Sequence, residues 1–416
     1  MTGNREVITA SDFKRMVSGA YSEFLLEYEN INQLPAAGKK PGTHVLRTMG
    51  AAVMPLHETK DDTIGGLSRR VAAGAVLGAR GTAGVVLSQL FRGIAKGLAG
   101  KYDATSSEFG KAFQYGILYA QRALSEPAES QLILVAKVVA KKAYRAVRDN
   151  KPISEILTAA LEGGEAAVKG IEHEEAGARI MMNFLSGCLK GLDGNFVSPA
   201  VSLSLGLESA DTDMPDPRHD MVRPYCVRFQ IRDVKVDVAA LTRQLKDFSN
   251  YVVVEPRERT VFVHMHTEHP GEVLEQGIGW GPLTHIHITD MSEGHVLEEH
   301  SGVMKVAMTA VADNKVQARE LQENGISIIL SGSEEVSPSV AALVNAAHSD
   351  LADNYVLIAW SEDFWPVFRQ AKWLLGSRVE LVLCHDKVEQ AKAVRAFNPE
   401  LSAKENAENM RRAIIA

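Results

Sequence analysis

Cysteine and histidine residues in the middle of the chain have the types and spacing of zinc ligands. His264 and His266 alternate within an apolar run, so a β-strand would point both imidazoles to one face of its sheet. Cys226 lies in another strand-like run that is expected to pair nearby. One thiolate and two imidazoles suit Zn²⁺, with a fourth position left for water or another group. The alternative is an exposed histidine pair without metal, and that interpretation is favoured for the second pair, His285 and His287.

A glycine-rich run, GARGTAG from Gly78 to Gly84, has the composition of an anion-binding helix start. A tight contact between two helices would explain the same glycines, and both interpretations stay open. Lys39, Lys40 and Arg80 could together attract an anion without a metal, although a solvated basic loop is the favoured interpretation.

The composition limits the class of protein. A chain of 416 residues with 45% hydrophobic residues predicts two or three globular domains. The net charge of -7 argues against nucleic acid as the main partner. Three scattered cysteines, Cys188, Cys226 and Cys384, are too few for a disulfide framework and fit a reducing compartment. No signal peptide and no transmembrane run is visible, so we expect a cytoplasmic protein.

Hydrophobic periodicity predicts helices from residue 8 to about 195. The first begins near Ser11, the expected N-cap, and the others lie at 66–78, 83–98, 107–124, 128–148, 153–169 and 174–191. Alanine and glycine on many helix faces predict closely packed helices. Residues 1–200 are therefore predicted to form an all-α domain.

The pattern changes twice after Gly194. Residues 201–219 contain prolines, serines and aspartates and read as a linker. Residues 220–302 alternate like strands and predict a small α+β middle domain. In residues 303–416, strand-like runs at 305–311, 326–330, 355–359 and 379–384 alternate with helical runs. That order predicts an α/β domain with a parallel sheet and a last helix capped by Ser402.

Several motifs resemble one family. PAAGKKPGTHVLRTM (35–49) is similar to the P-D-G-D-T-G-T-N-M-x-x-T-M loop of the ATP-binding L-subunit (DhaL domain) of dihydroxyacetone kinase. GARGTAGVVLSQLFRG (78–93) is similar to that domain's G-A-R-G-N-S-G-V-I-L-S-Q. FVHMHTEHPGEVLEQGI (262–278) resembles the middle domain of the ATP-binding subunit of bacterial fatty-acid kinase, and LSGSEEVSPSV (330–340) and RAFNPELSAKENAENM (395–410) resemble its DegV-like C-terminal domain.

The resemblance implies a fold, an activity and a set of site residues. It implies an eight-helix barrel that holds a nucleotide and Mg²⁺ at one end, and zinc on Cys226, His264 and His266. It implies ATP-dependent phosphorylation of a fatty acid presented by a lipid-carrying DegV-type partner, for phospholipid synthesis. The nucleotide or phosphate frame would comprise Gly42, Thr43, Gly78, Arg80, Gly81, Thr82 and Gly84.

The metal-binding part of this loop departs from the family pattern. The two aspartate positions hold Gly38 and Lys40. Mg²⁺ needs oxygen ligands, and a lysine ammonium repels it. Replacement carboxylates from Asp61, Asp62 or Glu27 are the alternative.

Three other elements of the implied nucleotide site also differ. Thr82 and Ala83 replace an Asn-Ser pair, and Gln131 replaces a threonine. Ala178 and Arg179 replace a Gly-Gln pair and would crowd a loop that normally approaches the nucleotide with bare backbone.

Three functions remain open. The leading hypothesis is a binding or regulatory pseudokinase that works with a DegV-type partner and forms a homo-oligomer. The first alternative is an active kinase subunit with an altered nucleotide site. The second is a zinc-dependent enzyme centred on the middle domain, for which no general base is identified, and no catalytic residue is assigned in any of the three.

Overall fold

The structure is a computed structural model that describes residues 7–415, except 37, 59–62, 124–130, 150, 172, 195–224, 235–236, 246–247, 249–251, 258–259, 268, 291–303 and 349–351. Contacts divide the chain into two compact units. The first comprises Met1–Asp213 together with Glu334–Val340, and the second comprises Met214–Ser333 and Ala341–Ala416. The predicted boundaries near residues 200, 220 and 303 fall outside the described ranges, so the four-part division stays a prediction.

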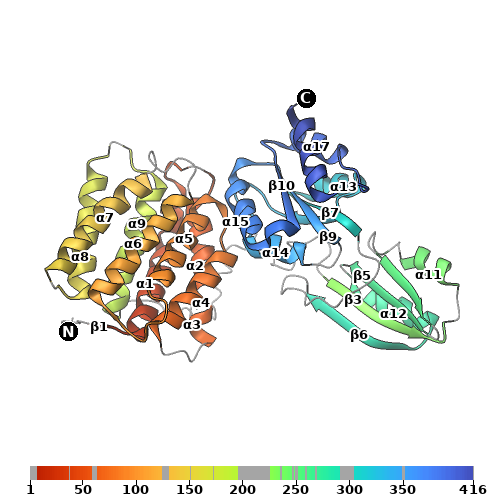
Figure 1. Ribbon diagram of the computed structural model, residues 1–416, viewed down its shortest axis with the longest axis horizontal. Helices are drawn as coiled ribbons and strands as arrows, with labels where there is room; N and C mark the ends of the chain where they lie inside the picture. Colours follow the sequence, from red (N-terminus) through yellow and green to blue (C-terminus); the bar gives the residue numbers. More distant parts are fainter. Residues whose placement is uncertain are drawn as a thin grey trace. The chain divides into compact units, whose positions relative to one another are not determined.

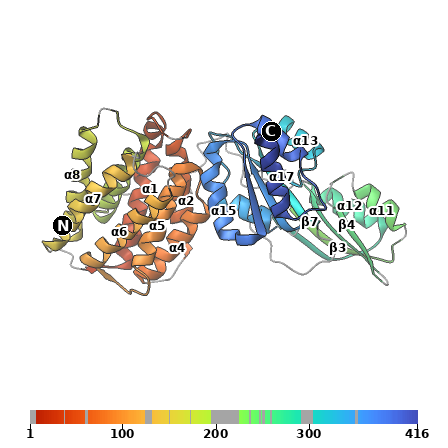
Figure 2. The same cartoon turned by 45° about the horizontal axis from the view of Figure 1, so that its top comes forward.

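The first unit is helical, as predicted (Figure 1). Its helices are α1 (Ala10–Asn32), α2 (Pro41–Val53), the short α3 (Pro55–Glu58), α4 (Ile64–Leu77), α5 (Gly81–Gly97), α6 (Ser106–Arg122), α7 (Gln131–Arg148), α8 (Ile153–Lys169) and α9 (Ala176–Leu192). A two-stranded pair, β1 (Val7–Ile8) and β2 (Ala104–Thr105), joins them. Each long helix packs on the next and α1 packs on α9, so the long helices close a ring around one core (Figure 2).

Glycines face each other where α1 packs on α9. A Cβ at Gly19 would lie 2.1 Å from the Gly187 oxygen, and a Cβ at Gly191 would lie 2.1 Å from the Arg15 oxygen. Such distances leave room only for hydrogen, so the predicted close helix packing is confirmed.

The first helix begins two residues earlier than predicted. Thr9, not Ser11, is the N-cap: its hydroxyl accepts the Asp12 N–H at 3.2 Å, and the Asp12 carboxylate accepts the Thr9 N–H at 3.1 Å. The reason is reciprocity. An acidic residue stands three positions after Thr9, whereas Lys14 stands three positions after Ser11 and cannot return the bond.

The middle region forms an antiparallel sheet in the order β4-β5-β3-β6. Its strands are β3 (Tyr225–Arg232), β4 (Val252–Arg257), β5 (Thr260–Thr267) and β6 (Leu283–Asp290), and its helices are α11 (Val238–Leu245) and α12 (Pro270–Trp280). Val227, Phe229 and Ile231 of β3 point to the buried core, with Val263 and Met265 of β5. Alternate residues of both strands therefore belong to the opposite face.

The C-terminal region contains the predicted parallel sheet, in the order β10-β9-β7-β8. Its strands are β7 (Met304–Ala312), β8 (Ile328–Ser331), β9 (Ala352–Ala359) and β10 (Val379–Leu383). Its helices are α13 (Lys315–Glu323), α14 (Val340–Ala347), α15 (Trp365–Leu375), α16 (Lys387–Arg395) and α17 (Ala403–Ile415). In Figure 1, α14 and α15 lie on one side of this sheet and α13 and α17 on the other. The predicted multidomain α and α/β fold class is confirmed.

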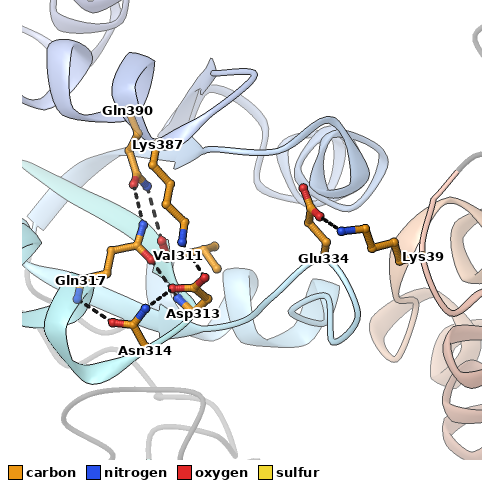
Figure 3. A network of polar contacts seen from close by, with 8 residues as sticks. All are labelled: Lys39, Val311, Asp313, Asn314, Gln317, Glu334, Lys387 and Gln390. Carbon is orange, nitrogen blue, oxygen red and sulfur yellow. Dashed lines mark hydrogen bonds and ion pairs between the residues drawn. The ribbon is translucent and has the colours of Figure 1, made fainter.

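Side chains close the carboxyl edge of the parallel sheet (Figure 3). Gln317 Nε2 donates to Gln390 Oε1 at 3.2 Å, and Gln390 Nε2 donates to the Val311 oxygen at 3.4 Å. Lys387 pairs with Asp313 at 2.5 Å. These contacts tie the starts of α13 and α16 to the end of β7.

The motif at 395–410 shapes the start of the last helix. Ser402 and Glu405 form a reciprocal cap, which confirms Ser402 as the cap residue. The fully buried Asn406 donates to the Asn398 oxygen at 2.9 Å and accepts the Asn398 N–H at 2.8 Å. The motif thus holds α17 onto the turn that precedes it. None of the described helices combines the length and the apolar character that a membrane span requires.

Candidate functional site

Loops before helices α2, α5, α7 and α9 meet at one end of the helical unit. The Ala176 N–H donates to the Pro35 oxygen at 2.9 Å, and the Glu175 N–H donates to Gln131 Oε1 at 2.9 Å. The Arg80 N–H points to a hydroxyl of α2 at 3.4 Å. The structure therefore brings together the four sequence elements to which the resemblance assigns one nucleotide site.

The start of α2 is fastened to the end of α1. Lys40 takes a left-handed backbone conformation, with φ 51°, directly before this helix. Asn32 accepts the Thr43 N–H at 3.1 Å and donates to the Thr43 hydroxyl at 2.9 Å. A Cβ at Gly42 would lie 2.0 Å from a backbone oxygen of α1. Gly42 and Thr43, both predicted phosphate-site residues, therefore make a structural link between the two helices.

The glycine-rich turn before α5 packs tightly on α2. A Cβ at Gly78 would lie 2.2 Å from a side-chain carbon of α2, and a Cβ at Gly84 would lie 2.3 Å from a side-chain oxygen of α2. Gly81 has φ 54°, and Thr82 is half-buried in the first turn of α5. Tight helix packing therefore explains Gly78 and Gly84. Anion binding by this turn stays a prediction.

Residues 334–340, which belong to the helical unit, lie against the same turn. Arg80 Nη1 donates to the Ser337 oxygen at 2.7 Å. The Ser337 N–H donates to His44 Nε2 at 3.4 Å, and the Val340 N–H donates to the Ala79 oxygen at 3.2 Å. Ser337 is fully buried. Main-chain groups of the segment thus meet both loops of the implied site.

A side-chain ion pair supplements these main-chain contacts. Lys39, in the loop before α2, pairs with Glu334 (Figure 3). The Lys39 side chain is 60% exposed, so this pair contributes at most about 1 kcal/mol. It orients the segment more than it holds it.

His44 is a site residue that the sequence analysis missed. It stands where the family loop has asparagine, and its side chain is buried. Burial lowers the pKa of His44 to about 4, with a further contribution from the positive charges of Arg80 and Arg47. At neutral pH the imidazole is therefore uncharged. A lone histidine in an otherwise small and apolar helix start was the available signal, and its meaning depends on neighbours distant in sequence.

Two departures from the family pattern make structural contacts. Gln131 donates to the His173 oxygen at 2.7 Å and accepts the Glu175 N–H at 2.9 Å. Arg179 forms a two-bond pair with Glu174, at 2.7 and 2.5 Å, which raises the pKa of the guanidinium. Both side chains therefore close the turn before α9 on the protein itself.

The replacement carboxylates considered for Mg²⁺ have different outcomes. Glu27 accepts a hydrogen bond from Asn30 at 2.9 Å, and its charge acts on Arg179. Asp61 and Asp62 lie outside the described residues. Within the described part of the chain, no three His, Cys, Asp or Glu side chains come together as a metal site.

Strand register places the predicted zinc ligands on one face of the middle sheet. Cys226 of β3 stands directly opposite His266 of β5, and Arg228 stands opposite His264. Val227 between them points to the core, so these four residues share the other face. Directly opposed Cβ atoms lie about 5 Å apart, within the reach of a shared zinc ion. His264 is buried, whereas the side chains of Cys226 and His266 lie outside the described residues, so ligation stays a prediction.

The second histidine pair lies on the neighbouring strand β6. His287 stands opposite Arg228 on the side away from His264. It is exposed, and His285 has φ 51° beside a shift in the register of β6. The two histidines therefore occupy a surface strand, and His287 shares the face of the predicted zinc ligands.

The two described cysteines are buried, as expected. Burial raises the pKa of Cys188 far above its usual value and that of Cys384 to about 12. Neither thiol is thus a reactive nucleophile at neutral pH.

Comparison with known families finds three matches in the order of the predicted domains. Residues 41–179 match the DAK2 domain, residues 223–297 match the FakA-like middle domain, and residues 307–416 match the FakA-like C-terminal domain. FakA denotes a fatty acid kinase subunit. The chain belongs to the FakA-like family. The family predicted from the motifs is confirmed.

Relatives of this FakA-like chain occur in several bacteria. Protein YloV of Bacillus subtilis is 26% identical over 426 residues, which cover 92% of this chain and 75% of that protein. An uncharacterized protein of Staphylococcus epidermidis is 24% identical, covering 93% of this chain and 76% of its own length. One from Staphylococcus saprophyticus is 26% identical, with 82% and 68% covered.

Proposed function

We propose that this chain is a fatty-acid-kinase subunit homologue whose helical unit does not bind Mg-ATP, and that it acts as a binding or regulatory protein. The observation that carries the proposal is the pair Gly38 and Lys40, at the two positions where the resemblance places metal-binding aspartates. Phosphoryl transfer depends on metal ions that neutralise the developing charge. A site with an ammonium in place of a carboxylate lacks that neutralisation.

The contacts around this loop support the proposal. Arg80, which could face a phosphate, donates to the Ser337 oxygen, and Lys39 pairs with Glu334. Gln131 and Arg179 hold the turn before α9. Groups that would otherwise receive a nucleotide are thus engaged with the protein.

Calorimetric titration tests this proposal. The full-length protein is titrated with ATP in the presence of Mg²⁺ and again with excess chelator. We expect no Mg²⁺-dependent heat at micromolar ATP. Micromolar binding that disappears with chelator would show a working nucleotide site and favour the active-kinase alternative.

We further propose that the protein's task lies in residues 220–416 and involves a lipid-carrying DegV-type partner. Cys226, His264 and His266 retain the family pattern, whereas the nucleotide loops depart from it. A chain beginning at Asp220 should therefore retain the association of the full protein, with the partner or with itself. Pull-down and light scattering compare this chain with residues 1–200. Association carried by residues 1–200 alone would contradict the proposal. The scattered cysteines favour work in the cytoplasm.

We propose zinc as the cofactor of the middle sheet. The donor set fits, because one cysteine and two histidines share a face across adjacent strands. Cys226, His264 and His266 would hold the ion, and zinc bound there would link β3 to β5. Water or another side chain would complete the coordination.

A further inference from the structure

The segment Glu334–Val340 is separated in sequence from the helices that it contacts. It follows β8 and leads into α14, yet it belongs to the helical unit. Ser337, Pro338, Ser339 and Val340 are all buried. A stretch with two serines and two glutamates is an unusual composition for a buried contact, so its polar groups need specific partners.

Those partners are the cationic and polar groups of the implied phosphate site. The Arg80 guanidinium binds a carbonyl oxygen of the segment, and the Lys39 ammonium binds its Glu334 carboxylate. His44, uncharged because it is buried, lies opposite a segment N–H. Oxygen atoms on a guanidinium and an ammonium are the same contacts that a phosphate would make.

We infer that Glu334–Val340 is an internal ligand of this site, and that its seating excludes phosphate from Arg80 and Lys39. The inference deepens the proposed function and rests on it only for the place of the phosphates. The reason for exclusion is the buried Ser337 oxygen. A phosphate that took Arg80 would leave this carbonyl without its charged donor, so the segment must leave when a phosphate enters.

Hydrogen exchange measures the seating of the segment in the full-length protein. The peptide that spans residues 334–340 should exchange slowly in the wild type, because the Ser337 and Val340 N–H groups are bonded. Arg80→Ala should accelerate that exchange by at least about tenfold, the effect of losing one hydrogen bond to a charged group. Arg69→Ala, at an exposed arginine of α4, is the control and should leave the exchange unchanged. Equal exchange in both variants would overturn the inference.

Binding of tripolyphosphate without metal measures the exclusion. Glu334→Lys replaces the attraction to Lys39 by repulsion and should unseat the segment. Tripolyphosphate should then bind at least about tenfold more tightly than to the wild type, since the occupied cations become accessible. Glu335→Lys adds the same charge at an exposed neighbouring side chain and should bind like the wild type. A further change, Lys39→Glu in the Glu334→Lys protein, should restore protection of the segment.

Each other outcome counts against the inference. Equal affinity in the two lysine variants would mean that added charge alone attracts the anion. Binding to neither variant at millimolar tripolyphosphate would mean that unseating exposes no anion site. If the wild type binds Mg-ATP tightly, the proposed function fails. If it does not, but the segment stays protected in Glu334→Lys saturated with tripolyphosphate, only the internal ligand fails.

Discussion

Gly81 and His44 are in contact across two helix starts: a Cβ at Gly81 would lie 2.3 Å from His44 Nδ1. The same glycine has φ 54°, a backbone conformation that other residues rarely adopt. His44 in turn accepts a hydrogen bond from Ser337. A side chain at position 81 would therefore push a buried imidazole against the segment behind it.

Gly81→Ala should lower the free energy of unfolding by about 2–4 kcal/mol, from backbone strain plus overpacking of a buried group. Gly100→Ala is the matched control, because Gly100 has φ 75° but no atom within 4 Å of its added Cβ. The control should cost about 1 kcal/mol, the strain alone. Urea unfolding of both variants and the wild type makes the measurement. Equal losses would mean that the His44 contact is unimportant.

His44 should make the helical unit sensitive to acid. Its pKa is lowered from 6.5 to about 4 in the folded protein, so below pH 6.5 the unfolded chain binds a proton that the folded chain does not. The contribution to stability is complete above pH 6.5 and is lost as the pH falls toward 4. The loss amounts to about 3 kcal/mol.

His44→Gln cannot take up this proton. The difference in unfolding free energy between wild type and variant should therefore shrink or reverse between pH 7 and pH 4.5. Carboxylates titrate in the same range but are common to both proteins, so the comparison cancels them. Parallel pH profiles would contradict the buried neutral histidine.

Zinc should be present at about one equivalent in protein purified without a histidine tag. Alanine at Cys226, His264 and His266 together should abolish it. Alanine at His285 and His287, on the exposed strand β6, is the matched control and should leave most of the zinc in place. Unchanged zinc in the triple variant would rule out the assignment. Unfolding of the middle sheet should also become easier in the triple variant, because metal binding contributes to folding.

Restoring the two aspartates should not restore Mg-ATP binding. Gly38→Asp and Lys40→Asp together supply the missing ligands of the family loop. Gln131 and Arg179 still hold the turn before α9, and Arg80 still binds Ser337. Calorimetry on the double variant, with Lys40→Ala as the control for charge removal alone, makes the test. Micromolar Mg²⁺-dependent binding would mean that those two positions alone account for the loss.

The sequence by itself determined the secondary structure and the family. Hydrophobic periodicity predicts helices because burial on one face repeats with the helical turn, and α5 to α9 follow the predicted runs closely. Caps are less certain, because two candidates can compete within one turn. Ser402 succeeded through Glu405, whereas Ser11 lost to Thr9, which has Asp12 as its partner.

Only the tertiary structure decided which groups meet. Alternation places His264 and His266 on one face, but the pairing of Cys226 with His266 depends on strand register. The contact of Arg80 with Ser337 spans 257 positions of the sequence. No local pattern encodes it, because a main-chain carbonyl carries no residue type and its partner is chosen by how the chain folds back. The same contact explains why the sequence predicted an exposed basic loop where the structure has a site engaged with its own chain.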